Sequence, residues 1–64
     1  MTDDPLPKIG APATRALASI GVTNLTQVAN CRVEDLLALH GFGPRAVEIL
    51  RVALAQRGLT FSAE

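Results

Sequence analysis

The stretch that decides the fold is residues 39–46, Leu39-His40-Gly41-Phe42-Gly43-Pro44-Arg45-Ala46. It lies between two segments whose apolar residues recur at helical spacing, so two helices must reverse direction within a few residues. Gly41 suits a positive φ at the end of the first helix, and Phe42 is expected to fill the gap between the two. Pro44 favours the first turn of the next helix, where its missing N–H does no harm. The stretch therefore predicts two helices joined by a tight hairpin.

The rest of the chain predicts further helices and no strand. The expected helices cover residues 11–20, 25–30, 33–39 and 44–57. Gly21 is expected to end the first helix in a left-handed conformation, with Val22 folding back over it. The apolar stripes, with Val22 and two residues after the last helix, predict a core of Ala13, Ala16, Leu17, Ile20, Val22, Leu25, Val28, Val33, Leu36, Leu37, Leu39, Ala46, Val47, Leu50, Ala53, Leu54, Leu59 and Phe61. No segment alternates like a half-buried strand. We expect a compact all-α domain of four to five helices at 9–61, between tails at 1–8 and 62–64.

A shift of 33 residues superposes two parts of the chain. Residues 6–10, Leu-Pro-Lys-Ile-Gly, align with 39–43, Leu-His-Gly-Phe-Gly, and a helix is expected after each. We interpret this as two tandem helix-and-hairpin units, with a chance match as the alternative. The first unit is degenerate, because no helix fits before it and Lys8 stands where the second unit has Gly41.

Composition excludes several classes of protein. The 64 residues include six basic and six acidic side chains, so net charge does not favour a nucleic-acid partner, although residues 5–63 carry six basic against three acidic. Cys31 is the single cysteine, which permits no internal disulfide and is read as a small buried hydrophobe. The N-terminus has no apolar run, so we expect a cytoplasmic chain without a membrane segment.

No catalytic or metal-binding pattern is present. His40 has no nucleophile or paired carboxylate beside it in the sequence, and the Cys and His spacing spells no metal site. We therefore expect no enzyme activity, no cofactor and no small-molecule substrate.

The hairpin is the candidate site. Gly43 would let a partner approach the backbone closely, and free N–H groups at a helix N-terminus attract anions, phosphate above all. Arg45 could add a charged contact. Lys8, Gly10 and Arg15 form a secondary candidate around the first unit. The alternatives are that the glycines serve only a tight turn, that Arg45 pairs with Glu48, and that Lys8 and Arg15 are solvated charges.

The pattern Leu-x-Gly-Phe-Gly-Pro-Arg-Ala at 39–46 resembles the helix-hairpin-helix motif of non-specific DNA-binding proteins. That resemblance implies a DNA phosphate on the hairpin amides, in some members with a weak monovalent cation on the carbonyls. About four-fifths of the chain also resembles the C-terminal domain of the bacterial RNA polymerase alpha subunit. The shared stretches are Val-Thr-Asn-Leu-Thr-Gln at 22–27, Glu-Asp-Leu-Leu at 34–37 and Leu-Ala-Gln-Arg-Gly-Leu at 54–59. One departure is Pro12, where that domain has a DNA-contacting arginine; Arg15 is the nearest substitute.

These observations favour a small bacterial-type protein that binds the phosphate backbone, with double-stranded DNA as the expected partner and little sequence preference. The nucleic-acid-binding residues expected are Gly41, Phe42, Gly43, Pro44, Arg45, Lys8, Gly10 and Arg15. The alternative function is a protein–protein interaction module, which the exposed edge with Val52 and Gln56 favours. A third possibility is one piece of a larger assembly.

Overall fold

The computed structural model describes residues 5–62 and is helical. Its elements are α1 (Ala11–Ser19), α2 (Leu25–Ala29), α3 (Val33–Leu37) and α4 (Pro44–Ala55). Residues 5–62 contain no strand, only an isolated bridge between Pro5 and Asn24. The expected all-α class is thereby confirmed. Of the tails expected at 1–8 and 62–64, residues 1–4 and 63–64 lie outside the described residues.

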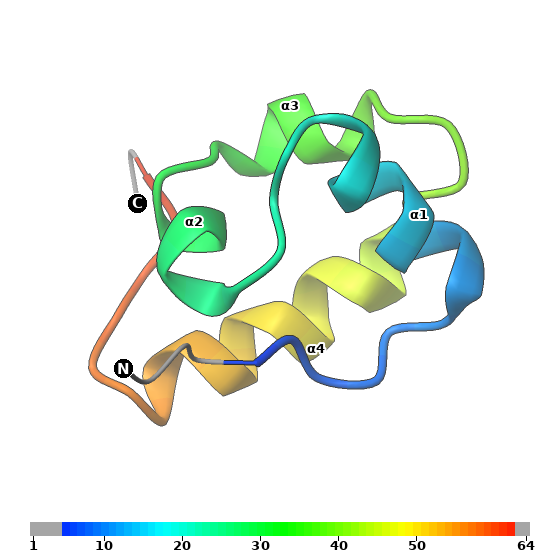
Figure 1. The fold of residues 1–64 in the computed structure, drawn as a ribbon. Helices are drawn as coiled ribbons and strands as arrows, with labels where there is room; N and C mark the ends of the chain where they lie inside the picture. Colours follow the sequence, from blue (N-terminus) through cyan, green and yellow to red (C-terminus); the bar gives the residue numbers. More distant parts are fainter. Residues whose placement is uncertain (1–4, 63–64) are drawn as a thin grey trace.

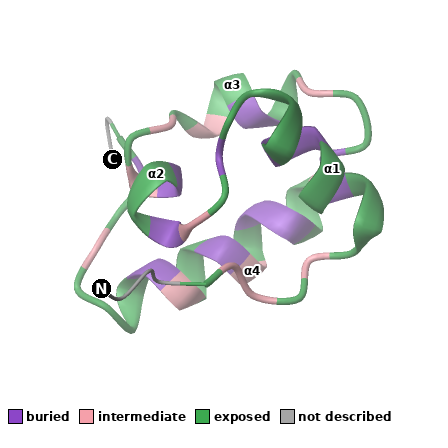
Figure 2. Cartoon of the chain, viewed as in Figure 1, coloured by how far each residue is buried: buried purple, intermediate pink, exposed green. Residues whose placement is uncertain are grey.

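Helix α4 supports the rest of the fold. It runs along one side of the molecule, with α1, α2 and α3 gathered on the other side (Figure 1). Buried residues follow the helix sides that face one another (Figure 2). The fully enclosed core consists of Ala13, Ala16, Leu17, Val22, Leu25, Val28, Leu36, Phe42, Ala46, Val47, Leu50, Leu54 and Phe61. The apolar stripes predicted all of these except three: Phe42 was expected to fill the hairpin, and Val22 and Phe61 were expected to fold back after a helix end.

The end of α1 corrects the prediction for Ile20. Gly21 has a φ of +78°, and the Val22 amide donates to the Leu17 carbonyl at 2.9 Å. This left-handed ending folds Val22 back over the helix, where it is buried. Ile20 lies at the C-cap and is 48% exposed. Val22 therefore covers the helix end in place of Ile20.

Asn24 is the N-cap of helix α2. The Gln27 amide donates to Asn24 Oδ1 at 2.8 Å, which satisfies one of the free donors of the first turn. The Gln27 side chain accepts a hydrogen bond from the backbone amide of Thr23, one residue earlier than a standard capping box has it. The reciprocal pair fixes the position at which the chain enters the helix.

Helix α3 is shorter than predicted. It ends at Leu37, and the Leu39 amide bonds to the Leu36 carbonyl at 3.0 Å in a tighter turn. Leu37 is 43% exposed, which corrects its assignment to the core. Leu37 lies about 100° around the helix from the fully buried Leu36 and is the last residue of this five-residue helix, on a side that no other element covers.

Helix α4 ends at Ala55, two residues before the expected end at residue 57. Gly58 has a φ of +71°, and the Leu59 amide donates to the Leu54 carbonyl at 2.8 Å. The chain then turns back, and Phe61 enters the core with 1% of its surface exposed. The guanidinium of Arg51 lies 5.6 Å from the centre of the Phe61 ring, a cation–π distance.

Both ends of the described chain are attached to the connections around α2. Pro5 pairs with Asn24, and the Ser62 amide donates to the Cys31 carbonyl at 2.9 Å. Cys31 is partly buried, and this burial, with the nearby Asp35 carboxylate, raises the pKa of its thiol. Pro5 and Ser62 therefore contact the domain, and Leu6 packs against the core.

Among the described residues, no helix combines the length and the apolar character that crossing a membrane requires.

Candidate functional site

The hairpin between α3 and α4 is held against the first turn of α1. Gly41 has a φ of +86°. A Cβ on Gly41 would lie 3.3 Å from Pro12 Cβ and 3.4 Å from the Pro12 carbonyl oxygen. Two features therefore favour glycine at position 41, the positive φ of the backbone and the close approach of α1. The positive φ was predicted; the contact with Pro12 was not.

Three amides of the hairpin have no acceptor among residues 5–62. They belong to Gly41, Gly43 and Arg45. The amides of Ala46 and Val47 donate to the Gly43 carbonyl, at 3.1 and 3.3 Å. Pro44 has no amide hydrogen. The first turn of α4 thus presents one free N–H, and the hairpin before it supplies the other two.

Phe42 faces the interior of the hairpin. Its side chain is 5% exposed, and its amide donates to the Leu39 carbonyl at 3.2 Å. Neither its ring nor its N–H is available to a partner, so Phe42 leaves the set of expected contact residues. Its role is to hold the two helices apart at the distance that the turn requires.

Gly43 is placed where a partner could approach. It caps α4 with φ −121° and ψ 176°, an extended conformation that any residue can adopt. No heavy atom lies within 4 Å of the position that a Cβ would take. The space beside Gly43 is therefore open, and glycine is not needed there for the fold.

A groove of about 440 Å³ lies between α1 and the hairpin. It is lined by Pro12, Arg15, Ala16, Ser19, His40 and Gly41. The structure thus brings Arg15 to the hairpin, 26 positions away in sequence from Gly41. Arg15 and His40 are exposed, and the Ser19 hydroxyl donates to the Ala16 carbonyl at 2.6 Å. Within the described part of the chain, no acidic side chain lines the groove.

Lys8 and Gly10 belong to a different surface. They line a separate hollow in front of α1, together with Leu6, Ile9 and other residues of that segment. Gly10 is the N-cap of α1 with φ +95°. The secondary site expected at Lys8, Gly10 and Arg15 is thus divided between two surfaces, and only Arg15 adjoins Gly41.

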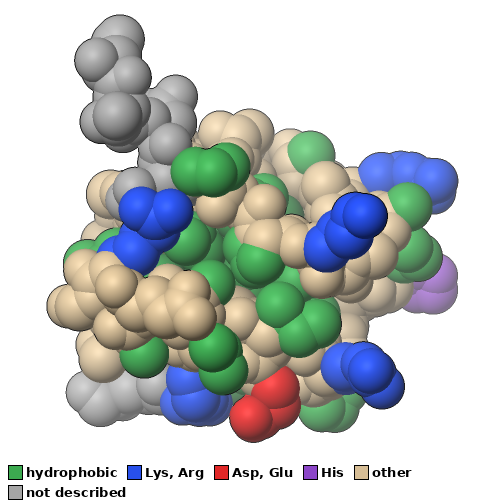
Figure 3. Space-filling model, turned by 90° about the horizontal axis from the view of Figure 1, so that it is seen from below, with side chains coloured by type: hydrophobic (Ala, Val, Ile, Leu, Met, Phe, Trp, Pro, Cys, Tyr) green, Lys and Arg blue, Asp and Glu red, His purple; other side chains and the backbone are tan. Residues whose placement is uncertain are grey.

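Acidic side chains are sparse around α4. Glu34 and Asp35 lie in the first turn of α3, where Glu34 pairs with Arg32 at 3.7 Å. The face seen from below has Lys and Arg side chains spread around it and few acidic ones (Figure 3). Arg45 is exposed and has no ion pair within residues 5–62, so the alternative in which it pairs with Glu48 is not formed. Over the same residues, no cluster of His, Cys, Asp or Glu could hold a metal ion.

The groove residues other than Arg15 and Gly41 were not among the expected contacts. The sequence does indicate that four of the groove residues share one helix face, because their spacing is i, i+3, i+4, i+7. They are Pro12, Arg15, Ala16 and Ser19. That face adjoins the apolar stripe through the shared Ala16. Only the docking of α1 on Gly41 shows that it forms a groove wall.

Comparison with protein-family models, with curated proteins and with solved structures found no match to this chain. The candidate site is therefore interpreted from its own geometry.

Proposed function

We propose that this chain binds the phosphate backbone of double-stranded DNA at the hairpin between α3 and α4. The observation that carries the proposal is the group of free amides at Gly41, Gly43 and Arg45, beside a groove that contains Arg15 and no acid. Free N–H groups at a helix N-terminus favour an anion, and guanidinium groups strengthen a phosphate contact. Arg45 and Arg15 would contact phosphates on either side of the bare turn.

The same site favours duplex over single-stranded nucleic acid. Proteins that bind single strands stack bases on exposed aromatic rings. This chain has no Trp or Tyr, and both of its phenylalanines are buried, Phe42 at 5% and Phe61 at 1% exposure. The hairpin also has few side chains that could hydrogen-bond to base edges, so we expect little sequence preference. With two to four phosphate contacts, we expect a dissociation constant of about 100 μM or weaker at physiological salt.

We also propose that the chain consists of two tandem units of the helix-hairpin-helix type. Gly10 and Gly43 each cap the helix that follows, and Leu17 and Leu50 then occupy equivalent buried positions. These correspondences support two related units of the helix-hairpin-helix type, of which the second is complete. Pro12 packs against Gly41. Pro12 therefore occupies the position at which the similar polymerase domain has its arginine. Arg15, one turn later in α1, would supply the positive charge.

The test is a titration of ¹⁵N-labelled protein with a short DNA duplex at low salt. We expect the amide signals of Gly41, Gly43 and Arg45 to shift first and furthest. A single strand of the same length should cause smaller shifts at the same concentration. The site would be wrong if these three signals stayed in place while other amides moved.

Protein interaction is a second candidate function. Val52 is 57% exposed on the outer side of α4, and Ile20 and Leu37 are also large exposed apolar residues. Sedimentation of the protein alone over a wide concentration range would favour this candidate if association appeared and added duplex had no effect on it.

A further inference from the structure

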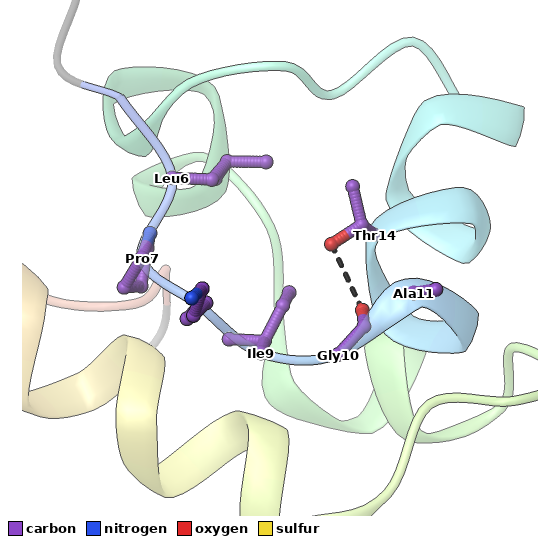
Figure 4. A pocket seen from close by; sticks show the side chains of 7 residues that line it. Leu6, Pro7, Ile9, Gly10, Ala11 and Thr14 are labelled. Atoms are coloured by element: carbon purple, nitrogen blue, oxygen red, sulfur yellow. Dashed lines mark hydrogen bonds between the residues drawn. The ribbon is translucent and has the colours of Figure 1, made fainter.

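A second hollow lies in front of α1, apart from the groove at the hairpin. It has a volume of about 560 Å³ and is lined by Leu6, Pro7, Lys8, Ile9, Gly10, Ala11 and Thr14. The side chains of Leu6 and Thr14 point toward one another across this space, and Ile9 enters it from the segment below (Figure 4). No residue is shared between this lining and that of the groove.

The walls of the hollow are mainly aliphatic. Leu6 and Ile9 are half-buried and pack against the core, which holds their side chains in place. The Thr14 hydroxyl donates to the Gly10 carbonyl at 2.9 Å, so its hydrogen is already engaged. Such a surface suits a branched apolar side chain.

The charge at the hollow has one sign. Among residues 5–62, Lys8 is the single charged residue that lines the hollow, and it is exposed. Over the molecule as a whole, the described residues outside α3 and its N-cap carry five basic side chains and one acidic. The basic residues are Lys8, Arg15, Arg45, Arg51 and Arg57, and the acidic residue is Glu48. An occupant that complements this hollow therefore joins an apolar group to a negative charge.

Nucleic acid is a poor match for this surface. Lys8 and the free amide of Ala11 at the start of α1 suit an anion, but a duplex backbone would leave the aliphatic side chains of the lining without an apolar partner. A base would need an aromatic ring to stack on, and both phenylalanines are buried. The chemistry of the lining thus points away from the partner of the hairpin.

We propose that the hollow in front of α1 binds a short acidic segment of a partner protein, in which a leucine-like side chain lies next to a carboxylate. The apolar side chain would rest against Leu6, Ile9 and Ala11, and the carboxylate would pair with Lys8. This interaction surface is independent of the hairpin, so the chain could hold a partner protein and a DNA backbone at the same time.

Two matched peptides test the proposal, N-acetyl-Leu-Glu-amide and N-acetyl-Leu-Gln-amide, each titrated into ¹⁵N-labelled protein. They differ in charge and hardly in shape. We expect the glutamate peptide to shift the amides of residues 8–14 with low-millimolar affinity, and the glutamine peptide to bind about two- to five-fold more weakly, as exposed ion pairs allow. Replacing leucine by alanine in the glutamate peptide should remove most of the shift.

Two variants complete the test, and both change exposed residues. Lys8→Glu should reverse the preference between the two peptides, and Ala11→Leu should fill the hollow and abolish binding of both. Arg15→Gln lies in the other groove and should bind both peptides as the wild type does. The proposal is overturned if residues 8–14 do not respond, if Ala11→Leu binds normally, or if a DNA duplex shifts residues 8–14 as strongly as 41–45. DNA binding is tested by the amide shifts of residues 41–45, so the peptide proposal and the DNA proposal can fail separately.

Discussion

Three glycine-to-alanine variants separate the two reasons for glycine at the hairpin. Gly41 has a positive φ and lies against Pro12, whereas Gly21 has a positive φ of +78° with nothing within 4 Å of its would-be Cβ. Gly43 has neither feature. Because a left-handed conformation costs an alanine about 1–2 kcal/mol, Gly21→Ala should lower the free energy of unfolding by about that amount. Gly43→Ala should stay within about 0.5 kcal/mol of the wild type.

Gly41→Ala should be the most damaging of the three. Its Cβ would meet Pro12 Cβ at 3.3 Å and the Pro12 carbonyl at 3.4 Å. These contacts are tight, and backbone atoms yield less readily than a side-chain tip. We expect about 1 kcal/mol of overpacking beyond the conformational cost, hence a total of about 2–3 kcal/mol.

Urea unfolding followed by far-ultraviolet circular dichroism measures all three variants. In thermal melts, each kcal/mol should lower Tm by about 4–8 °C in a domain of this size. Equal losses for Gly41→Ala and Gly21→Ala would refute the contact between the hairpin and α1. A loss at Gly41 as small as that at Gly43 would refute the left-handed turn itself.

Three further predictions concern charge, capping and the thiol. Arg15→Gln and Arg45→Gln should each reduce the slope of log affinity against log salt by about 0.9 in duplex binding, whereas Arg32→Gln, which lies before α3, should leave the slope unchanged. Asn24→Ala removes the acceptor for the first turn of α2 and should cost about 1 kcal/mol in urea unfolding. The pKa of the Cys31 thiol is raised in the folded chain, which favours the neutral thiol there. The folded state therefore loses stability relative to the unfolded state as pH rises through that pKa. At mildly alkaline pH, iodoacetamide should therefore alkylate Cys31 more slowly in the folded protein than in urea, which mass spectrometry can follow.

Much of the fold could be predicted because glycine and proline mark the ends of its helices. Gly21 and Gly58 end α1 and α4 with left-handed turns, and Asn24 caps α2; glycine and asparagine are residue types that favour these positions. The errors fall where a helical stripe was extended too far. Ile20 and Leu37 match the apolar period, yet each lies at a helix end where the chain turns away from the core.

The candidate site was predictable in its local part and not in its tertiary part. The turn at Gly41 and the open position at Gly43 follow from residue type and spacing alone. The groove required the docking of α1 on the hairpin, a contact between residues far apart in sequence. The Ala46 amide donates to the Gly43 carbonyl, so it is not free for a ligand. This bond depends on the geometry of the first turn of α4, which the residue types alone do not determine.

The central claim is that a phosphate lies against the open backbone at Gly43. The most direct measurement compares the dissociation constants of wild type, Gly43→Gln and Gly43→Glu for one short duplex over a range of salt concentrations. The two variants are nearly isosteric and project into open space, so both should fold. We predict that Gly43→Glu binds about ten-fold more weakly than Gly43→Gln at low salt, a difference of about 1.4 kcal/mol that shrinks as salt screens the charge. Equal affinities for the glutamine and glutamate variants at low salt would contradict a phosphate at this turn.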